Sequence, residues 1–486
     1  MKKIIFRADG NLETGLGHLY RIFALISIYS KKYTCILITR EYSPKNIIPA
    51  EIQVKIIPDR ITTELEPDWL NKNYDSDNHI LVADGYYFVE NFQKRVKELG
   101  YYFIYIDDLN AWHQYADVVI NHAPGIDASN YNSTSYTKFA LGPKYAILRK
   151  SFLEAAKKER KIPELKAAFV CFGGSDQFNF SLMATIALLS IKKIKKINVL
   201  LGASYNNIEI FNLQKNNSKV QLFQNIEEDK IVQILNESDF AISSSSNILY
   251  EICCIKMPII AGYYIKNQIL LYEGCKLNGL IFEGGSFLNF KQSDFKSKIL
   301  SLIKENNYQK YITAQNTIFD SKIEQRLLNL TYVINYRKAE SKDMELIFNL
   351  SNDQTTRENS FSSALIDIEA HKIWFEKKLI DQNTTILIAE LENKILGIVR
   401  FEEKEEYDVI GILVAEEFRG NGLAEILISN TTNQYIKKNC RRILAFIKSQ
   451  NLASIKSFKN AGYKFLKKNQ IQGQNCLIYS FKIQDV

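Results

Sequence analysis

The chain has 486 residues, of which 46% are hydrophobic and 24% are charged. This length exceeds one ordinary hydrophobic core, so we expect two or three domains, and the composition excludes a disordered chain. The net charge of +8 comes from basic residues spread along the sequence, which favours a solvated lysine-rich surface over a nucleic-acid-binding patch. We therefore expect no nucleic-acid partner.

The chain carries no sign of export or of disulfide bonding. Its seven cysteines have no CxxC spacing, so neither a disulfide framework nor a metal site is expected. The apolar run of "MKKIIF" stops at Arg7, and no apolar stretch approaches the ~20 residues that span a bilayer. We expect a cytoplasmic protein with reduced thiols, no metal and no membrane contact.

Short apolar runs alternate with amphipathic stretches from residue 1 to about 145. "KIIF", "TCILIT", "HILVAD", "YFIYID" and "ADVVIN" have the pattern of buried strands, and "HLYRIFALISIYS" that of a helix. The alternation begins again after the charged stretch 149–163, with "AAFVCF", "INVLLG", "VQLF", "DFAIS" and "PIIAGY". Each half therefore predicts a doubly wound parallel sheet, which binds ligands beyond the carboxyl ends of its strands.

The pattern changes after about residue 335. Two helical stretches precede the strands of "TILIAELENKILGIVRFEE" and "YDVIGILVAEE", which predicts an α+β domain with its own core. The predicted domains are residues 1–148, 149–334 and 335–486.

The first glycine-rich segment is "RADGNLETGLGHLYR", from Arg7 to Arg21. Gly15 and Gly17 permit a tight turn close to a ligand. His18 then falls in the first turn of a predicted helix, where the positive end of the helix dipole disfavours imidazolium. A neutral imidazole can accept a proton, so His18 fits a general base beside a bound anion. The alternative is that His18 only caps the helix or packs under the loop.

This opening resembles that of the UDP-2,4-diacetamido-2,4,6-trideoxy-β-L-altropyranose hydrolases of pseudaminic acid synthesis, relatives of the MurG-type GT-B glycosyltransferases. The similarity covers residues 1 to about 330. Further segments that carry it are "LVADGYYF", "LGPKYAILRKSF", "VCFGGSDQFN", "SSSNILYEICCIKMPII" and "YIKNQ". The resemblance implies a GT-B-like pair of Rossmann-type domains and metal-free, inverting hydrolysis of a UDP-sugar.

The same resemblance implies the roles of individual residues. His18 would take a proton from the attacking water, while Tyr86 and Asn267 would position the sugar or the water. The residues expected to bind UDP or the sugar are Asp9, Gly15, Gly17, Arg21, Gly173, Gly174, Ser175, Ser245, Ser246, Asn247 and Glu251.

Two of these groups also have a physical argument. The glycine turn at 173–175 and the serine run at 245–247 each precede a helix, whose N-terminus can hold a diphosphate. Ordinary helix capping is the alternative for the serines, and a plain surface position is the alternative for Glu251. We expect the acidic pair Asp107–Asp108 to close a strand rather than to bind a metal.

The second glycine loop, "RGNGLA" at 419–424, follows a strand and opens a helix. It resembles the acetyl-CoA signature of the GNAT acyltransferases, and "NLASIKSFKNAGYKF" resembles their later conserved segment. Acetyl-CoA is therefore the expected acyl donor. The residues expected to bind it are Ile412, Leu413, Val414, Arg419, Gly420, Asn421, Gly422, Leu423, Ala424, Asn451 and Ser454.

The acid and base of this domain stay open at the level of the sequence. Phe458 stands where many GNAT members have a tyrosine that protonates the departing thiolate, and Tyr463 has the character of a core residue. His371 and Glu369 fall in a segment that resembles the sugar-recognition region of GNAT enzymes acting on amino sugars. Either is a candidate base.

Together these features predict a bifunctional enzyme of pseudaminic acid biosynthesis. It would acetylate the 4-amino group of a UDP-sugar and then remove UDP from the product. The alternative is a UDP-sugar-dependent glycosyltransferase of the same fold with a GNAT module that is non-catalytic or differently specific. The sequence also leaves a legionaminic-type precursor open.

Overall fold

The computed structural model describes residues 2–10, 16–174, 176–305 and 307–482. The chain forms two compact units, an N-terminal unit (Met1–Thr331) and a C-terminal unit (Tyr332–Val486). The N-terminal unit holds two wholly parallel sheets, and the C-terminal unit holds one mixed sheet. No helix in the described ranges combines the length and apolar character needed to cross a bilayer.

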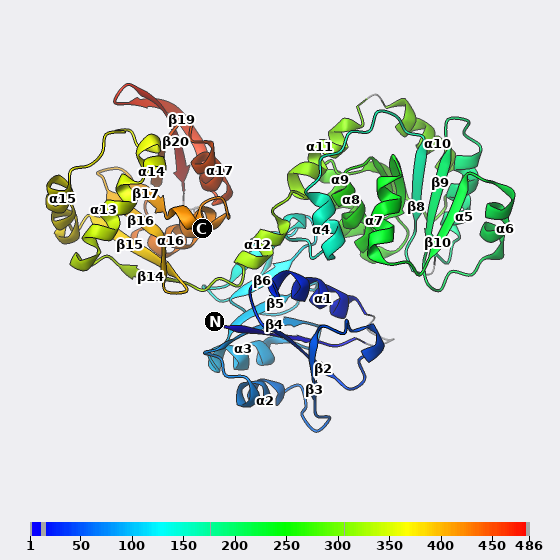
Figure 1. Ribbon diagram of the computed structural model, residues 1–486, viewed down its shortest axis with the longest axis horizontal. Helices are drawn as coiled ribbons and strands as arrows, with labels where there is room; N and C mark the ends of the chain where they lie inside the picture. Colours follow the sequence, from blue (N-terminus) through cyan, green and yellow to red (C-terminus); the bar gives the residue numbers. More distant parts are fainter. Residues whose placement is uncertain (1, 11–15, 175, 306, 483–486) are drawn as a thin grey trace. The chain divides into compact units, whose positions relative to one another are not determined.

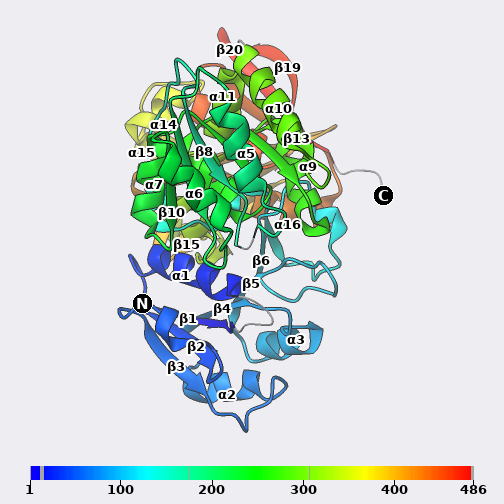
Figure 2. The ribbon, with the colours of Figure 1, turned by 90° about the vertical axis from the view of Figure 1, so that its right-hand side faces the viewer.

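The first parallel sheet has the strand order β3-β2-β1-β4-β5-β6-β7. Its strands are β1 (Lys3–Ala8), β2 (Cys35–Arg40), β3 (Gln53–Ile57), β4 (His79–Asp84), β5 (Tyr102–Ile106), β6 (Val118–Asn121) and β7 (Lys138–Leu141). Helix α1 (Gly17–Tyr29) covers one face, and α2 (Glu66–Asn73) and α3 (Glu90–Glu98) cover the other (Figures 1 and 2). Successive residues of β1 accordingly enter different cores, Ile4 and Phe6 on one side and Ile5 on the other.

The second parallel sheet has the order β10-β9-β8-β11-β12-β13. Its strands are β8 (Ala167–Cys171), β9 (Lys196–Leu201), β10 (Val220–Gln224), β11 (Phe240–Ser244), β12 (Ile259–Tyr263) and β13 (Phe282–Ser286). The helices of this part are α4 (Lys150–Ala156), α5 (Phe180–Leu189), α6 (Ile208–Asn216), α7 (Glu228–Asn236), α8 (Asn247–Ile255), α9 (Ile269–Leu277), α10 (Gln292–Lys304), α11 (Gln309–Ile318) and α12 (Ile323–Asn329). The two parallel sheets predicted from the sequence are confirmed.

In both sheets the strand order reverses at one point, between β1 and β4 in the first and between β8 and β11 in the second. Loops that follow such a pair of strands leave in opposite directions and open a crevice at the carboxyl edge, where ligands of this kind of sheet bind. One hydrophobic core extends from α1 through α12 to the second sheet. The Tyr29 hydroxyl adds a hydrogen bond of 3.0 Å to the carbonyl of Leu327.

The C-terminal unit is an α+β domain around a sheet of order β14-β15-β16-β17-β18-β20-β19. Its strands are β14 (Ile334–Lys338), β15 (Thr384–Leu391), β16 (Lys394–Glu403), β17 (Asp408–Val414), β18 (Ile443–Lys448), β19 (Lys464–Ile471) and β20 (Gln474–Phe481). Its helices are α13 (Met344–Asn352), α14 (Gln354–Asn359), α15 (Ile368–Ile380), α16 (Leu423–Asn439) and α17 (Leu452–Asn460).

Strands β17 and β18 are parallel neighbours that pair only at their beginnings, Asp408 with Ile443 and Val409 with Leu444. Past these pairs the described residues of the two strands form no further ladder. The backbone groups of β17 from Ile410 onward are therefore not satisfied by β18 on that side, and unpaired backbone groups can receive an extended ligand.

A buried ion network fixes the end of β1. The Arg7 guanidinium is fully buried and donates to Asp9 at 2.6 and 2.8 Å and to Glu66, at the start of α2, at 2.8 and 3.0 Å. Burial opposes ionisation of Asp9, but the Arg7 charge lowers the pKa of this carboxyl to about 2. Arg7 thus bridges the two buried carboxylates, and Arg40 adds a second ion pair to Glu66.

Replacing Arg7 with methionine should strongly destabilise the N-terminal unit, since buried Asp9 would lose the guanidinium it pairs with and Glu66 would keep only Arg40. We expect a loss of about 3–5 kcal/mol, measured as a lower urea midpoint. Arg95→Met is the matched control, because Arg95 pairs with Asp68 at the exposed surface and should barely shift that midpoint. Equal midpoints for the two variants would contradict this account of the network.

Candidate functional site

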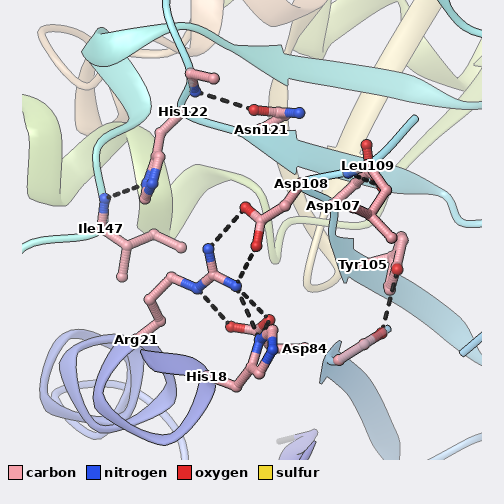
Figure 3. A network of polar contacts seen from close by, with 12 residues as sticks. His18, Arg21, Asp84, Tyr105, Asp107, Asp108, Leu109, Asn121, His122 and Ile147 are labelled. Carbon is pink, nitrogen blue, oxygen red and sulfur yellow. Dashed lines mark hydrogen bonds and ion pairs between the residues drawn. The ribbon is translucent and has the colours of Figure 1, made fainter. Parts of the chain in front are cut away.

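A histidine–aspartate pair lies where the strand order of the first sheet reverses. His18 is the second residue of α1, the helix that follows β1, and Asp84 is the last residue of β4. His18 Nδ1 lies 2.7 Å from Asp84 Oδ1, and both side chains are buried (Figure 3). When Nδ1–H donates to Asp84, the neutral ring keeps its lone pair on Nε2. The pair therefore has the arrangement of a base and the group that orients it.

Arg21 braces this pair from the next turn of α1. Its guanidinium donates to both oxygens of Asp84, each at 2.8 Å, and to both oxygens of Asp108 at 2.8 and 2.7 Å (Figure 3). Burial of Asp108 is outweighed by the Arg21 charge, which lowers the pKa of this carboxyl. Arg21 was predicted to bind UDP. In the structure its N–H groups are bonded to two carboxylates, and these bonds hold Asp84 in place.

Of the three predicted catalytic residues, the structure brings two together. The Tyr86 ring meets the His18 ring edge-on, with 4.7 Å between the centroids, and remains 45% exposed. Asn267 is exposed in a short 3₁₀ helix (Lys266–Gln268) that follows β12 in the second sheet. Among the described residues, Asn267 forms no hydrogen bond with His18 or Tyr86.

The other predicted ligands beside β1 differ in their surroundings. Asp9 is buried, and its carboxylate also accepts from the Thr39 and Tyr87 hydroxyls at 2.9 and 2.8 Å. Its oxygens are thus filled by protein donors. A Cβ on Gly17 would meet no atom of the described residues within 4 Å. Gly15 and Ser175 lie outside the described residues.

The glycine turn after β8 is shaped by a close backbone approach. Gly173 has φ of +87°, and a Cβ on Gly202 would lie 1.8 Å from the carbonyl oxygen of Gly174. Only glycine fits at position 202. The helix that follows is already capped, because the Asp176 carboxylate accepts from the Phe180 and Ser181 amides at 2.9 and 2.8 Å. A diphosphate at this turn would have to use amides of the turn itself.

The N-terminus of α8 is less occupied. Its N-cap residue Ser246 makes no side-chain capping bond, and Asn247 is exposed. The Ser245 hydroxyl is buried without a hydrogen-bond partner among the described residues. Free helix amides, the dipole and an unsatisfied hydroxyl form a favourable environment for an anion.

Glu251 lies one turn into α8 and is held by Arg149. The guanidinium donates to its two oxygens at 2.8 and 2.9 Å. Burial raises the pKa of Glu251, and the Arg149 charge opposes that shift. Its carboxylate oxygens keep lone pairs that can accept from hydroxyl groups, so the pair with Arg149 does not remove this capacity.

His122 is a site residue that the sequence analysis missed. It follows β6, and its Nδ1 accepts from the Ile147 amide at 3.3 Å (Figure 3). Its carbonyl accepts from the Tyr250 hydroxyl of α8 at 2.7 Å. Burial and the Arg21 charge lower the pKa of His122 to about 4. The signal in the sequence is its position one residue after a predicted strand, which Asp108 shares, while Asp84 is the last residue of the strand between β1 and β5.

The acetyl-CoA loop has the backbone that its glycines predict. Gly420 and Gly422 have φ of +79° and +76°, and Gly422 precedes α16 as its N-cap. Arg419 donates to the Val414 carbonyl at 2.9 Å and pairs with Asp353 at 2.6 Å. The bond to Val414 connects the loop to the end of β17. The carboxylate of Asp353 balances the charge of Arg419.

The remaining residues predicted to bind acetyl-CoA lie in the loop itself or at the N-terminus of α17. Leu423, the first residue of α16, is buried, whereas Asn421 and Ala424 are partly exposed. Asn451 caps α17 by accepting from the Ser454 amide at 3.0 Å. Tyr463 is buried with its hydroxyl 2.8 Å from that of Thr432, a position in the core.

Comparison with known proteins gives separate matches for the two parts of the chain. Residues 345–463 match the acetyltransferase (GNAT) family. The chain is 27% identical over 271 residues to the UDP-2,4-diacetamido-2,4,6-trideoxy-β-L-altropyranose hydrolase of Campylobacter jejuni, covering 55% of this chain and 93% of that protein. It is also 26% identical over 510 residues to an uncharacterized protein of Methanocaldococcus jannaschii, covering 99% and 100%.

Among solved structures, the spermidine N-acetyltransferase of Vibrio cholerae in complex with CoA and spermine is 17% identical. The match covers 30% of this chain and 94% of that chain, with a TM-score of 0.28. The family match confirms that the C-terminal unit contains a GNAT acetyltransferase domain, and acetyl-CoA is the acyl donor of that class. The N-terminal half of the chain is similar to the hydrolase over nearly that enzyme's full length.

His122 should make the N-terminal unit acid-sensitive. Between pH 6.5 and 4 the unfolded chain binds a proton at this ring that the folded chain does not, so the stability present above pH 6.5 is lost as the pH falls. In His122→Asn, Oδ1 can still accept from the Ile147 amide. We expect the decrease in the free energy of unfolding between pH 7.5 and pH 5 to be smaller in this variant by about 1–2 kcal/mol. Urea unfolding at both pH values measures this decrease. If the decrease is the same in wild type and variant, the His122 ring does not stay neutral in the folded protein.

Proposed function

We propose that this chain is a bifunctional nucleotide-sugar enzyme. Its N-terminal unit would hydrolyse UDP-2,4-diacetamido-2,4,6-trideoxy-β-L-altropyranose to the free sugar and UDP, with inversion. Its C-terminal unit would first acetylate the 4-amino group of the UDP-sugar precursor with acetyl-CoA. The observation that carries the hydrolase assignment is the His18–Asp84 pair at the carboxyl edge of the first sheet, supported by the similarity to the Campylobacter hydrolase.

In this proposal the two parallel sheets act as a GT-B-like pair, each contributing its carboxyl edge to one substrate. The diphosphate would lie on the N-terminus of α8 at Ser245 and Ser246, and Glu251 would accept from ribose hydroxyls. The contact of Tyr250 with the His122 carbonyl supports this, since it joins α8 directly to the edge that carries His18. Tyr86 and Asn267 would position the sugar or the water.

The hydrolytic step follows from the imidazole. Water attacks the anomeric carbon on the face opposite UDP, its proton passes to His18 Nε2, and the bond from the anomeric carbon to the diphosphate oxygen breaks. Asp84 favours the positive charge that develops on the ring, and Arg21 keeps Asp84 fixed. UDP leaves as a stable anion, so the proposal needs neither a strong acid nor a metal.

The acetylation step uses the GNAT domain. The amine of the sugar attacks the thioester carbonyl directly, so no covalent enzyme intermediate forms. The pyrophosphate of acetyl-CoA would bind the amides of the 420–423 loop at the N-terminus of α16, and its acyl arm would follow Ile412 to Val414 of β17. The stretch of β17 beyond Val409, which pairs with β16 but not with β18, supports this path.

Replacing His18 with alanine should lower kcat for UDP release by about 10²–10⁴-fold and leave the Kd for UDP unchanged, because the ring acts on water and not on the nucleotide. Release of UDP from the diacetamido substrate is followed by a coupled assay and binding by calorimetry. His113→Ala, at a hydrogen-bonded histidine of a neighbouring loop, is the control and should keep its rate. Undiminished turnover in His18→Ala would defeat the assignment.

Omitting any sugar acceptor distinguishes hydrolysis from glycosyl transfer. The full-length protein should release free sugar from the diacetamido substrate at its full rate in buffer alone. A glycosyltransferase would release it only slowly until an acceptor is added, and that result would replace the proposed activity with the alternative one.

Supplying the UDP-4-amino sugar with and without acetyl-CoA tests the coupling of the two steps. The free 2,4-diacetamido sugar should appear only when acetyl-CoA is present, because the amine must be acetylated first. Chromatography with mass spectrometry identifies the product. If that sugar never appears while the ready-made diacetamido substrate is hydrolysed, the bifunctional assignment fails and the hydrolase assignment stands.

A further inference from the structure

The C-terminal unit contains a cavity of about 420 Å³ against the face of β15, β16 and β17 and among α13, α14 and α15. Its lining is mostly apolar, with Trp374 as the largest side chain. The lining residues are Ile347, Ser351, Thr356, Arg357, Ser360, Ile366, Ala370, His371, Trp374, Ile386, Ile398, Arg400, Gly411, Ile412 and Leu413. Ile412 and Leu413 belong to the stretch of β17 proposed above to carry the acyl arm, so the thioester would be delivered at this cavity.

Two polar atoms of the lining are buried and have no hydrogen-bond partner among the described residues, His371 Nε2 and Arg357 Nε. Buried polar groups are almost always paired, because an unpaired one loses its hydration without return. The terminal nitrogens of Arg357 are used, since they donate to the carbonyls of Ser362 and Ala364 and to the Ser360 hydroxyl. Three of its four terminal N–H groups are bonded in this way, so the guanidinium is fixed while its buried Nε–H has no partner among the described residues.

The surroundings of His371 define its chemical state. The ring is 2% exposed and packs against Phe348, Trp374 and Phe375, with centroid distances of 5.4, 5.3 and 6.2 Å. Burial lowers the pKa of His371, and a hydrogen bond to the Met344 backbone carbonyl partly offsets this shift. Because Nε2 has no partner, the bond to the carbonyl comes from Nδ1–H, which leaves an unshared pair on Nε2.

The charges of the lining indicate which acceptors fit. Arg357 from α14 and Arg400 from β16 are its charged groups, and no Asp or Glu is among the described residues that line it. The elements α13, β15 and β17 contribute apolar side chains, a glycine and the Ser351 hydroxyl. Arg400 lies over the Trp374 ring at 5.3 Å and pairs with Glu402 at 3.0 Å. A polycationic amine would find no counter-charge here, whereas a neutral or anionic acceptor would not be repelled.

We propose that this cavity binds the acceptor of the acetyl transfer, a neutral or anionic amine with apolar surface, and that His371 Nε2 takes the proton of its attacking amine while Arg357 Nε–H binds an acceptor oxygen. The new bond joins the amine nitrogen to the acetyl carbon, the carbon–sulfur bond breaks, and CoA leaves as a thiolate that solvent protonates. This inference rests on the proposed acetyl transfer and assigns its base. The apolar lining suits a deoxy-sugar with a methyl group.

The test compares full-length His371→Gln with wild type, using acetyl-CoA and the UDP-4-amino sugar. The variant should lose about 10²-fold in kcat, keep its KM for acetyl-CoA, and recover rate as the pH rises, since hydroxide and free amine then replace the missing base. Hydrolysis of the ready-made diacetamido substrate should be unchanged, which verifies folding of the N-terminal unit. Lys372→Gln, exposed on the same helix, is the matched control and should act as wild type.

Each outcome separates this inference from the proposed function. If wild type acetylates the sugar and His371→Gln does so at the same rate and with the same pH profile, the assignment of the base is wrong. A loss in Glu369→Gln in place of His371→Gln would move the base to that exposed carboxylate. If wild type transfers no acetyl group to the sugar, the proposed function fails before His371 is tested.

A separate experiment tests which class of amine the cavity accepts. Arg357→Lys keeps the charge but removes the Nε–H, so the KM for the sugar should rise about tenfold with little change in kcat. Spermidine serves as the polycationic probe and should be acetylated far more slowly than the sugar. Spermidine turnover equal to or faster than that of the sugar would overturn the acceptor class.

Discussion

The buried carboxylate of Asp84 is the constraint on which the candidate hydrolytic site depends. An ionised carboxylate with no exposure is costly unless its oxygens are paired, and here His18 and Arg21 together supply the pairing. Both partners come from successive turns of α1, so the helix is locked to the end of β4. The short contact of Nδ1 with the Asp84 carboxylate favours the tautomer that carries its proton on Nδ1 and its unshared pair on Nε2. Structure and proposed chemistry thus rest on one group.

The two parallel sheets use their reversal points differently. In the first, acidic and imidazole side chains lie at the carboxyl edge, where the proposed reaction needs a proton acceptor. In the second, Asp176 occupies amides of α5, while the N-terminus of α8 has no side-chain capping bond and the Ser245 hydroxyl has no partner in the described part of the chain. The anion-binding capacity therefore concentrates on α8, which also contacts His122 through Tyr250. A negatively charged leaving group on α8 and a base on α1 are the complementary halves of a hydrolytic reaction.

The sequence predicted the parallel sheets and the α+β domain because buried parallel strands appear as uninterrupted apolar runs. It placed the turn at Gly173 and the loop at 420–422 because their backbone needs positive φ. It could not predict which charged residues are already paired. Asp9, Arg21 and Glu251 were assigned to the substrate, yet their main partners in the structure are Arg7, Asp84 and Arg149. The partners of Arg21 and Glu251 are 63 and 102 residues away, and only folding brings them together. For the same reason His122 went unnoticed, and the unpaired Nε2 of His371 became visible only with its cavity.

The central claim is that water attacks the anomeric carbon with His18 as its base. Hydrolysis of the diacetamido UDP-sugar in ¹⁸O-labelled water tests it directly, with ³¹P NMR of the released UDP as the readout. The account predicts UDP without label, because the bond that breaks joins the anomeric carbon to oxygen. Label in the β-phosphate of UDP would mean attack at phosphorus and would contradict the account.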